Sequence, residues 1–204
     1  MNKSILTKLG NKIELIDGKG KTLIIGVFHG DEPQGKYLID EYFKINNAEG
    51  LLFIPCLNPD GLQLGKRTNA NGVDLNRNFP TKNWELTEKN EFFGGMSAGS
   101  EIETRFLIDT INEFKPELIL TLHAPYKVVN YDGPAKEISE KISQIINYPV
   151  EESIGYPTPG SFGTYAGIER QIPTITLELD EVCPVQDLVK PIFQIFDMLK
   201  KRGL

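Results

Sequence analysis

Short apolar runs alternate with amphipathic stretches along this chain, and that alternation limits the possible folds more than any other feature. Four runs are apolar enough to be strands buried on both faces: residues 22–28, 51–55, 118–122 and 174–179. Such strands, separated by helices, predict an α/β fold with a mixed, largely parallel sheet flanked by helices. An additional edge strand is expected at residues 13–16.

The stretches between these runs carry apolar residues at helical spacing. Helices are expected at residues 33–43, 101–114, 134–146 and 185–199. The chain has 204 residues, and α/β folds of about this size commonly form one compact domain. We therefore predict a single catalytic domain over residues 1–204.

Composition and charge exclude several classes of protein. Hydrophobic residues make up 40% of the chain and charged residues 25%, which is typical of a globular protein. A net charge of −6 argues against a nucleic-acid partner. No apolar run reaches the ~18 residues of a membrane span, and the first residues are too charged for a signal peptide. We expect a cytoplasmic protein with no membrane partner, for which a homo-oligomer is possible.

Three reactive side chains follow or end predicted strands. His29 comes directly after the first run, His123 directly after the third, and Glu178 lies near the end of the fourth. Ligands of open α/β sheets bind just outside the carboxyl ends of the strands. Because the chain has only two histidines, any histidine-dependent chemistry must use one or both of them.

Glu32 follows His29 by three residues, at the expected turn into a helix. Two histidines and a glutamate form the ligand set of many catalytic zinc sites, which keep a fourth position for water. The His-x-x-Glu spacing is common by chance, and its alternative is a carboxylate favoured by the helix dipole. The second histidine at a strand end favours the metal site.

Glu178 admits two interpretations. A carboxylate at the end of a buried strand is costly unless it has a partner or a task. Glu178 is either a general base or the partner of a buried arginine or helix end. Asp180 lies on the same strand face; it either meets an ammonium group of a substrate or caps the following helix.

A long polar stretch, residues 58–83, interrupts the alternation and contains NPDGLQLGKRTNANGVDLNRNFP. Loops of this length are usually functional or disordered. Arg67 and Arg77 lie in it, and their planar guanidinium groups suit carboxylates and oxyanions. The alternative is a solvated loop with two exposed arginines.

These motifs, taken in order, resemble the zinc carboxypeptidase family. HGDE, NPDG, GVDLNRNFP, a strand-end histidine and the glutamate of TLEL run from His29 to Glu178, about three quarters of the chain. Together with GYPTPGSFG, they are most similar to members that cleave the γ-D-glutamyl-meso-diaminopimelate amide of murein peptides. The resemblance implies a metallocarboxypeptidase-like hydrolase with one Zn²⁺ per chain. Its substrate would be a small peptide with a free carboxylate beside the scissile amide.

The resemblance also implies a role for each matched residue. The metal ligands would be His29, Glu32 and His123, and the general base would be Glu178. Asp74 would orient the first histidine, and Arg67 would polarise the scissile carbonyl. The substrate-binding residues would be Asn76, Arg77, Tyr156 and Phe162.

Two other functions stay open. A deacylase resembling aspartoacylase and succinylglutamate desuccinylase shares the HGxE start and a DLNR-like segment. Such deacylases usually lack NPDG and carry a further C-terminal domain, for which residues 180–204 leave no room. A non-catalytic member that only binds peptide typically loses a ligand or the base, whereas this chain has all four residues.

Overall fold

The structure, a computed structural model, describes residues 3–152 and 158–202. Its strands form one sheet in the order β1-β2-β4-β3-β5-β8-β6-β7. The strands are β1 (Lys3–Leu6), β2 (Lys12–Asp17), β3 (Thr22–Gly26), β4 (Leu52–Ile54), β5 (Leu118–His123), β6 (Tyr126–Asp132), β7 (Val150–Glu151) and β8 (Thr174–Asp180).

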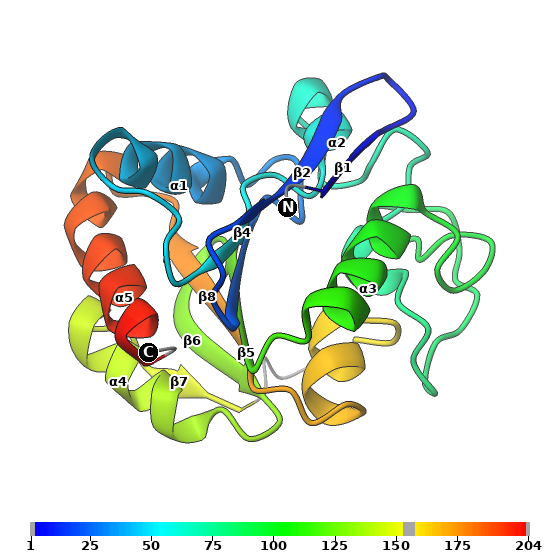
Figure 1. Cartoon of the computed structure of the whole chain (residues 1–204). Helices are drawn as coiled ribbons and strands as arrows, with labels where there is room; N and C mark the ends of the chain where they lie inside the picture. Colours follow the sequence, from blue (N-terminus) through cyan, green and yellow to red (C-terminus); the bar gives the residue numbers. More distant parts are fainter. Residues whose placement is uncertain (1–2, 153–157, 203–204) are drawn as a thin grey trace.

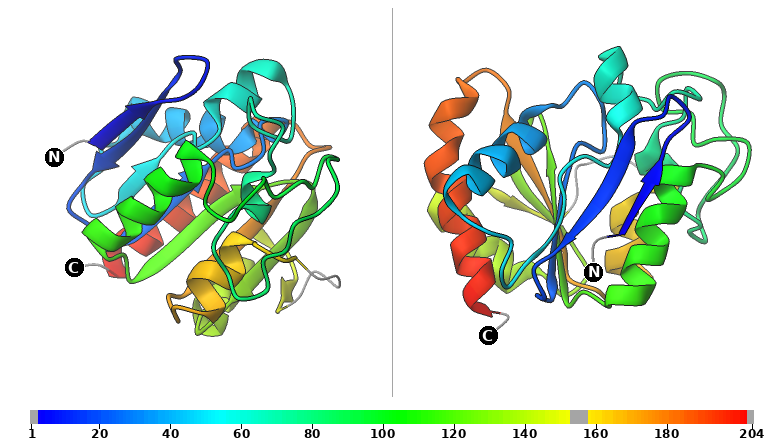
Figure 2. Two further views of the ribbon diagram at one scale, coloured as in Figure 1. Left: turned by 90° about the vertical axis from the view of Figure 1, so that its right-hand side faces the viewer. Right: turned by 45° about the horizontal axis from the view of Figure 1, so that its top comes forward.

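Helices cover both faces of this sheet. The α-helices are α1 (Gln34–Ile45), α2 (Pro59–Leu64), α3 (Ile102–Phe114), α4 (Lys136–Ile146) and α5 (Val189–Arg202). Three short helical turns are η1 (Leu75–Arg77), η2 (Thr164–Ile168) and η3 (Val185–Leu188). Helices α1, α4 and α5 lie on one side of the sheet, and α3 and η2 lie on the other (Figures 1 and 2).

Each face of the sheet has its own apolar core, because successive strand residues point to opposite faces. In β3, Ile24 belongs to the apolar cluster that includes side chains of α1, α4 and α5, whereas Leu23 and Ile25 belong to the cluster that includes side chains of α3 and η2. All five residues of β3 are buried. The two-sided burial expected from the continuous apolar runs is therefore confirmed.

The predicted α/β fold is confirmed. Strands β4, β3, β5 and β8 pair in parallel at the centre of the sheet. Strands β1, β2 and β6 pair antiparallel toward its ends. The expectation of an edge strand at residues 13–16 is wrong in one respect, because β1 pairs with the outer side of β2 and forms the edge itself. The β1–β2 hairpin lies beside α3, where Lys3 Nζ is 3.0 Å from Glu113 Oε2.

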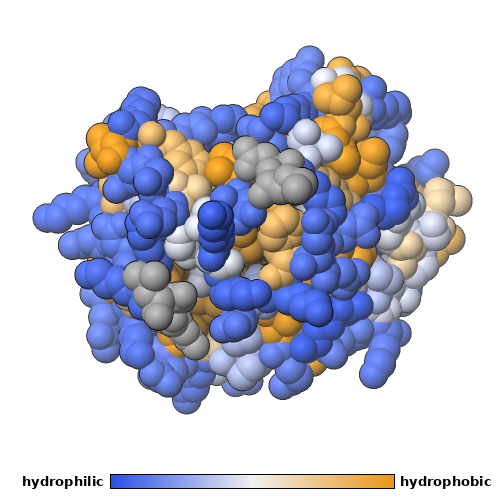
Figure 3. Space-filling view, viewed as in Figure 1, coloured by the Kyte–Doolittle hydropathy of each residue, from blue (hydrophilic) through white to orange (hydrophobic). Residues whose placement is uncertain are grey.

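The surface seen in Figure 3 is mostly polar. Apolar atoms gather where Figure 1 places β1, β2 and α2, and the exposed apolar residues of these elements and their turns include Leu6, Leu9 and Leu64. Within the described part of the chain, no helix combines the length and the apolar character that a membrane crossing requires.

The polar stretch after β4 is ordered by its own side chains. Asn58 caps α2 by accepting a hydrogen bond from the Gly61 N–H at 2.9 Å. Asp74 begins η1 and accepts from the Asn76 N–H at 2.8 Å. Both are fully buried, so the stretch predicted to be either functional or disordered is a fixed part of the structure.

Candidate active site

Two histidines and a glutamate meet beyond the carboxyl ends of β3 and β5. His123 is the last residue of β5, while His29 and Glu32 lie in the connection between β3 and α1. Because β3 and β5 are parallel neighbours, their carboxyl ends lie side by side. One possible ligand atom from each of these three residues lies within 4.8 Å of the other two.

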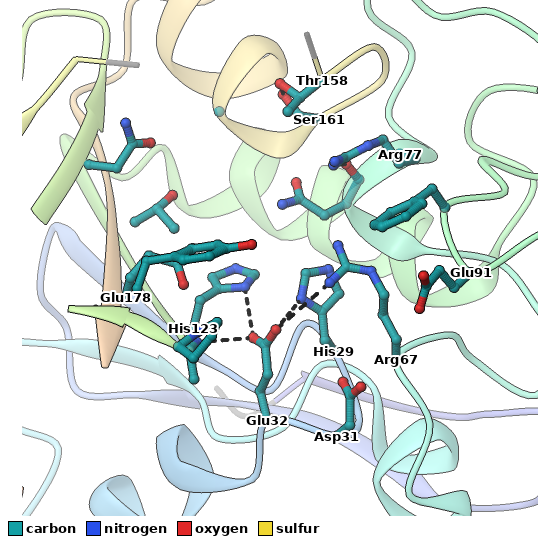
Figure 4. A pocket seen from close by; sticks show the side chains of 18 of the residues that line it. His29, Asp31, Glu32, Arg67, Arg77, Glu91, His123, Thr158, Ser161 and Glu178 are labelled. Carbon is teal, nitrogen blue, oxygen red and sulfur yellow. Dashed lines mark hydrogen bonds and ion pairs between the residues drawn. The ribbon is translucent and has the colours of Figure 1, made fainter. Parts of the chain in front are cut away.

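The same nitrogen of each histidine faces the glutamate (Figure 4). His29 Nδ1 is 2.8 Å from Glu32 Oε1, and His123 Nδ1 is 3.0 Å from Glu32 Oε2. Two imidazole nitrogens and a carboxylate form a donor set that Zn²⁺ prefers. The residues present therefore fit a zinc ion.

Asp74 holds the first histidine from behind. Its Oδ1 is 3.2 Å from His29 Nε2, and its Oδ2 accepts a hydrogen bond from Arg67 Nε at 3.0 Å. A carboxylate on the outer nitrogen of a ligand histidine fixes the ring orientation and its tautomer. Asp74 is in the position that this role requires.

The charges of this cluster are strongly coupled. Burial lowers the pKa of His29, but Asp74 and Glu32 outweigh burial and raise that pKa to about 9. Burial opposes ionisation of Glu32 and Asp74, yet the neighbouring histidines hold the pKa of Glu32 well below its usual range, and His29 and Arg67 do the same for Asp74. Burial lowers the pKa of His123. Both carboxylates are therefore ionised at neutral pH.

Glu178 lies next to this cluster on β8. It is paired in register with His123 across the parallel β5–β8 ladder. Its Oε2 is buried and has no hydrogen-bond partner among the described residues. Burial, followed by the charge of Glu32, raises the pKa of Glu178 to about 8. A poorly solvated carboxylate that keeps one oxygen without a hydrogen bond, beside a metal-binding group, suits a general base.

Arg67 and Arg77 face the same cavity from the polar stretch. Arg67 is tied to Asp74, and its Nη1 is 3.9 Å from Glu32 Oε1. Arg77 is only 8% exposed, and its guanidinium Nη1 donates to the Asn76 carbonyl oxygen at 2.7 Å. Among the residues that the structure describes, no carboxylate oxygen lies within 4.0 Å of Arg77. A buried cation without a counter-ion marks a position for an anionic ligand.

Asn76 and Phe162 are linked across the cavity wall. The Phe162 N–H donates to Asn76 Oδ1 at 2.8 Å, which leaves the amide nitrogen of Asn76 available to a ligand. The expectation that Phe162 itself binds substrate needs correction. Phe162 is 2% exposed, and its ring packs against Phe28 and Phe79. It therefore supports the cavity wall without lining the cavity. Tyr156 lies outside the described residues.

One cavity of about 780 Å³ connects these groups. Of the residues predicted from the sequence, it is lined by His29, Glu32, Arg67, Asn76, Arg77, His123 and Glu178. It also contains residues that sequence reasoning missed, among them Phe92 and Asp132. The ring centroid of Phe92 is 5.1 Å from the Arg67 guanidinium carbon and 6.0 Å from that of Arg77.

The sequence held a usable signal for only one of these two. Asp132 ends YKVVNYD, in which polar and apolar residues partly alternate, as in a strand with one polar face. Phe92 belongs to a segment without periodicity, so no local pattern points to it.

Metal binding can be tested with His123→Ala. We expect this variant to lose stoichiometric zinc, because it removes one of the three converging ligand atoms. Its far-UV circular dichroism should stay close to that of the wild type. The measurement is zinc per chain after dialysis, and one zinc per chain in the variant would contradict this ligand set.

The raised pKa of Glu178 predicts a pH-dependent loss of stability in the metal-free protein. The pKa of Glu178 is about 8 in the folded protein and 4.5 in the ordinary, unfolded state. The stability that its protonated form contributes is therefore fully present below pH 4.5 and is lost as the pH rises through 8. Glu178→Gln cannot ionise and should escape this loss. We expect the unfolding free energy of the variant, relative to wild type, to rise by on the order of 4 kcal/mol between pH 4.5 and pH 9.

Urea unfolding in the presence of a chelator measures this difference. A difference between the two proteins that does not change with pH would show that Glu178 titrates normally.

Comparison with known proteins gives a consistent result. The family model of zinc carboxypeptidases (peptidase M14) matches residues 8–165. The chain is 35% identical over 157 residues to murein peptide amidase A of Escherichia coli (strain K12), covering 71% of this chain and 64% of that protein. It thus spans slightly less than two thirds of that relative's length. A second murein peptide amidase A, from Vibrio campbellii, is 34% identical over 184 residues, covering 82% of this chain and 72% of that protein.

A solved structure is also similar over nearly the whole chain. The crystal structure of murein-tripeptide amidase from Escherichia coli O157 superposes with a TM-score of 0.87 at 28% sequence identity. The superposition covers 98% of this chain and 91% of that one. The arrangement of sheet, helices and polar stretch described above is therefore shared with an enzyme of known structure.

Proposed function

The chain belongs to the zinc carboxypeptidase family, and on that premise we propose that it is an amidase of murein peptides. The bond cleaved would be the amide between γ-D-glutamate and meso-diaminopimelate. One observation carries the proposal: the buried guanidinium of Arg77, which has no carboxylate partner among the described residues, opens into the cavity that also holds His29, Glu32, His123 and Glu178. That arrangement suits an amide with a free carboxylate beside it.

The residues that would hold zinc are His29, Glu32 and His123. A zinc ion bound there supplies Lewis acidity, which lowers the pKa of water and polarises a carbonyl oxygen. Asp74 keeps the His29 ring oriented for this purpose.

Glu178 would move the protons of the reaction. It accepts a proton from the attacking water, whose oxygen forms a bond to the scissile carbonyl carbon. It then gives a proton to the leaving amine as the C–N bond breaks. The carboxylate returns to its starting state, and one water is consumed for each bond cleaved.

The two arginines would bind the two groups that carry negative charge, the developing oxyanion and the free carboxylate. Arg67, which lies close to the His29–Glu32 pair in Figure 4, would stabilise the oxyanion that develops from the scissile carbonyl. Arg77 and the amide nitrogen of Asn76 would hold the neighbouring carboxylate of the leaving residue.

The substrate class is supported by the two relatives named murein peptide amidase A. A cytoplasmic role in recycling cell-wall peptides, without a nucleic-acid or membrane partner, remains our prediction from the sequence. A deacylase acting on acyl-amino acids is the second candidate, because such a substrate would also present a carboxylate to Arg77.

Mass spectrometry of products distinguishes these functions. We would incubate the zinc-loaded protein with L-Ala-γ-D-Glu-meso-diaminopimelate and, in parallel, with N-acetyl- and N-succinyl-amino acids. We expect L-Ala-D-Glu and free diaminopimelate, each reaction having taken up one water. Hydrolysis of the acyl-amino acids alone would support the deacylase, and no hydrolysis of any of them would support a binding protein.

A further inference from the structure

Asp132 is a carboxylate in the wall of the catalytic cavity for which the proposed chemistry has no use. In the antiparallel β6–β8 ladder, Val128 pairs with Glu178, and Asp132 pairs with Thr174. Residues two apart on a strand share a face, so Asp132 and Glu178 point to the same side of the sheet. Both line the cavity.

The surroundings of Asp132 hold the carboxylate in place but leave it unpaired. Among the described residues, no cation lies within 4.0 Å of it and no hydrogen-bond donor reaches it, and burial is the only influence on its pKa. A Cβ atom on Gly163 would lie 2.0 Å from Asp132 Oδ2, and one on Gly167 would lie 2.3 Å from Asp132 Cβ. The carboxylate therefore occupies space that two glycines leave open.

The acidic residue that the sequence offered for an ammonium group is already used. Asp180 Oδ2 is 2.8 Å from Lys127 Nζ, and Asp180 Oδ1 accepts from the Val182 N–H at 2.9 Å. Asp180 is also absent from the cavity wall. In the described part of the chain Asp132 has neither kind of partner, and burial raises its pKa only to about 6, so it is largely ionised at pH 7 to 8.

The cavity therefore has positive and negative walls. Arg67 and Arg77 come from the polar stretch, whereas Asp132 comes from β6. We propose that Asp132 binds the primary ammonium group at the far end of the leaving residue's side chain, while Arg77 binds that residue's α-carboxylate. This inference rests on the proposed function, and it names the side-chain chemistry that the same site selects.

The spacing along the strand suits a long side chain. Asp132 is four residues from Val128, the partner of Glu178, which is roughly 13 Å along an antiparallel strand. The side chains of Glu178 and Asp132 take up part of that distance. A chain of several methylene groups that ends in an ammonium ion takes up the rest.

Three matched peptides test the inference. All carry L-Ala-γ-D-Glu and end in meso-diaminopimelate, L-lysine or L-norleucine. Lysine lacks only the distal carboxylate of diaminopimelate, and norleucine also lacks the ammonium group. For the wild type, we expect kcat/KM for the lysine peptide to exceed that for the norleucine peptide by roughly ten- to a hundredfold, as one charge-assisted hydrogen bond requires.

Asp132→Asn keeps the shape of the side chain and removes its charge. We expect the lysine-to-norleucine ratio to fall to within about threefold of one in this variant. The matched control is Glu152→Gln, which removes an exposed charge that also borders the cavity. The lysine-to-norleucine ratio should stay at its wild-type value in the control. An equal fall of that ratio in Glu152→Gln would indicate a general effect of negative charge and would overturn the proposed contact.

A binding measurement separates this inference from the proposed function. Calorimetry of N-acetyl-lysine and N-acetyl-norleucine with the zinc-loaded protein needs no turnover. Preferential binding of N-acetyl-lysine that depends on Asp132 would support the inference even if no peptide were cleaved. Cleavage of all three peptides at similar rates, with equal binding of the two ligands, would overturn it while leaving the amidase function intact.

Discussion

Glu178→Gln is expected to lower kcat on a murein peptide by roughly 10²–10⁴-fold, the usual effect of removing a general acid–base group. The glutamine amide keeps the size of the side chain but cannot accept a proton from water. Zinc content and KM should change little, because Glu178 is outside the group of three metal-binding residues. The measurement is steady-state kinetics of the zinc-loaded variant with zinc determined in the same sample.

Glu181→Gln is the matched control for this experiment. Glu181 also borders the cavity, but its side chain is exposed. We expect kcat to stay within about threefold of wild type in this control, as for most surface substitutions away from the reacting atoms. Near-normal turnover of Glu178→Gln would return Glu178 to a structural role.

The centre of the fold could be predicted from the sequence because its elements carry strong local patterns. The strand at residues 22–26 is apolar at nearly every position, as expected for a strand that is covered on both faces. The ends of such strands are easy to locate in a sequence. His29, His123 and Glu178 could therefore be assigned from the sequence alone to the carboxyl ends of neighbouring strands, and the parallel strand pairing confirms that placement.

The borders of the sheet could not be predicted in the same way. Strand β6 presents Asn130 and Asp132 to the cavity, so its polar and apolar residues alternate only in part, and this pattern is weaker than the continuous apolar runs of the central strands. Strand β7 has only two residues. Both are specified by their neighbours in the sheet rather than by their own composition.

The sequence could not predict which of the expected substrate-binding side chains face the cavity and which are buried behind its wall. Arg77 and Phe162 both lie in motifs of the family, and both were expected to bind substrate. Arg77 is buried yet opens into the cavity, whereas Phe162 supports the wall from behind through its N–H bond to Asn76. Which of two residues in a loop lines a cavity depends on how distant segments pack against it.

Arg77 gives the second large expected effect, and it is measured with the substrate rather than with the protein. Amidation of the carboxylate next to the scissile amide removes the charge that Arg77 would bind. A hydrogen bond to a charged group contributes roughly 1.5–3 kcal/mol, so kcat/KM should fall by about ten- to a hundredfold or more. The buried guanidinium would also be left without a counter-ion, which adds to the loss.

Arg77→Lys completes a cycle with the two substrates. Lysine keeps the positive charge but cannot present two parallel N–H groups, so the variant should lose most of its activity on the free acid. On the amidated peptide, the same substitution should cost far less, because the contact that it removes is already absent. The two changes together should therefore be strongly non-additive, as expected for groups in direct contact. If wild type cleaves both peptides equally well, or if the losses simply add, Arg77 does not bind this carboxylate and the cavity accepts amides without a free acid beside them.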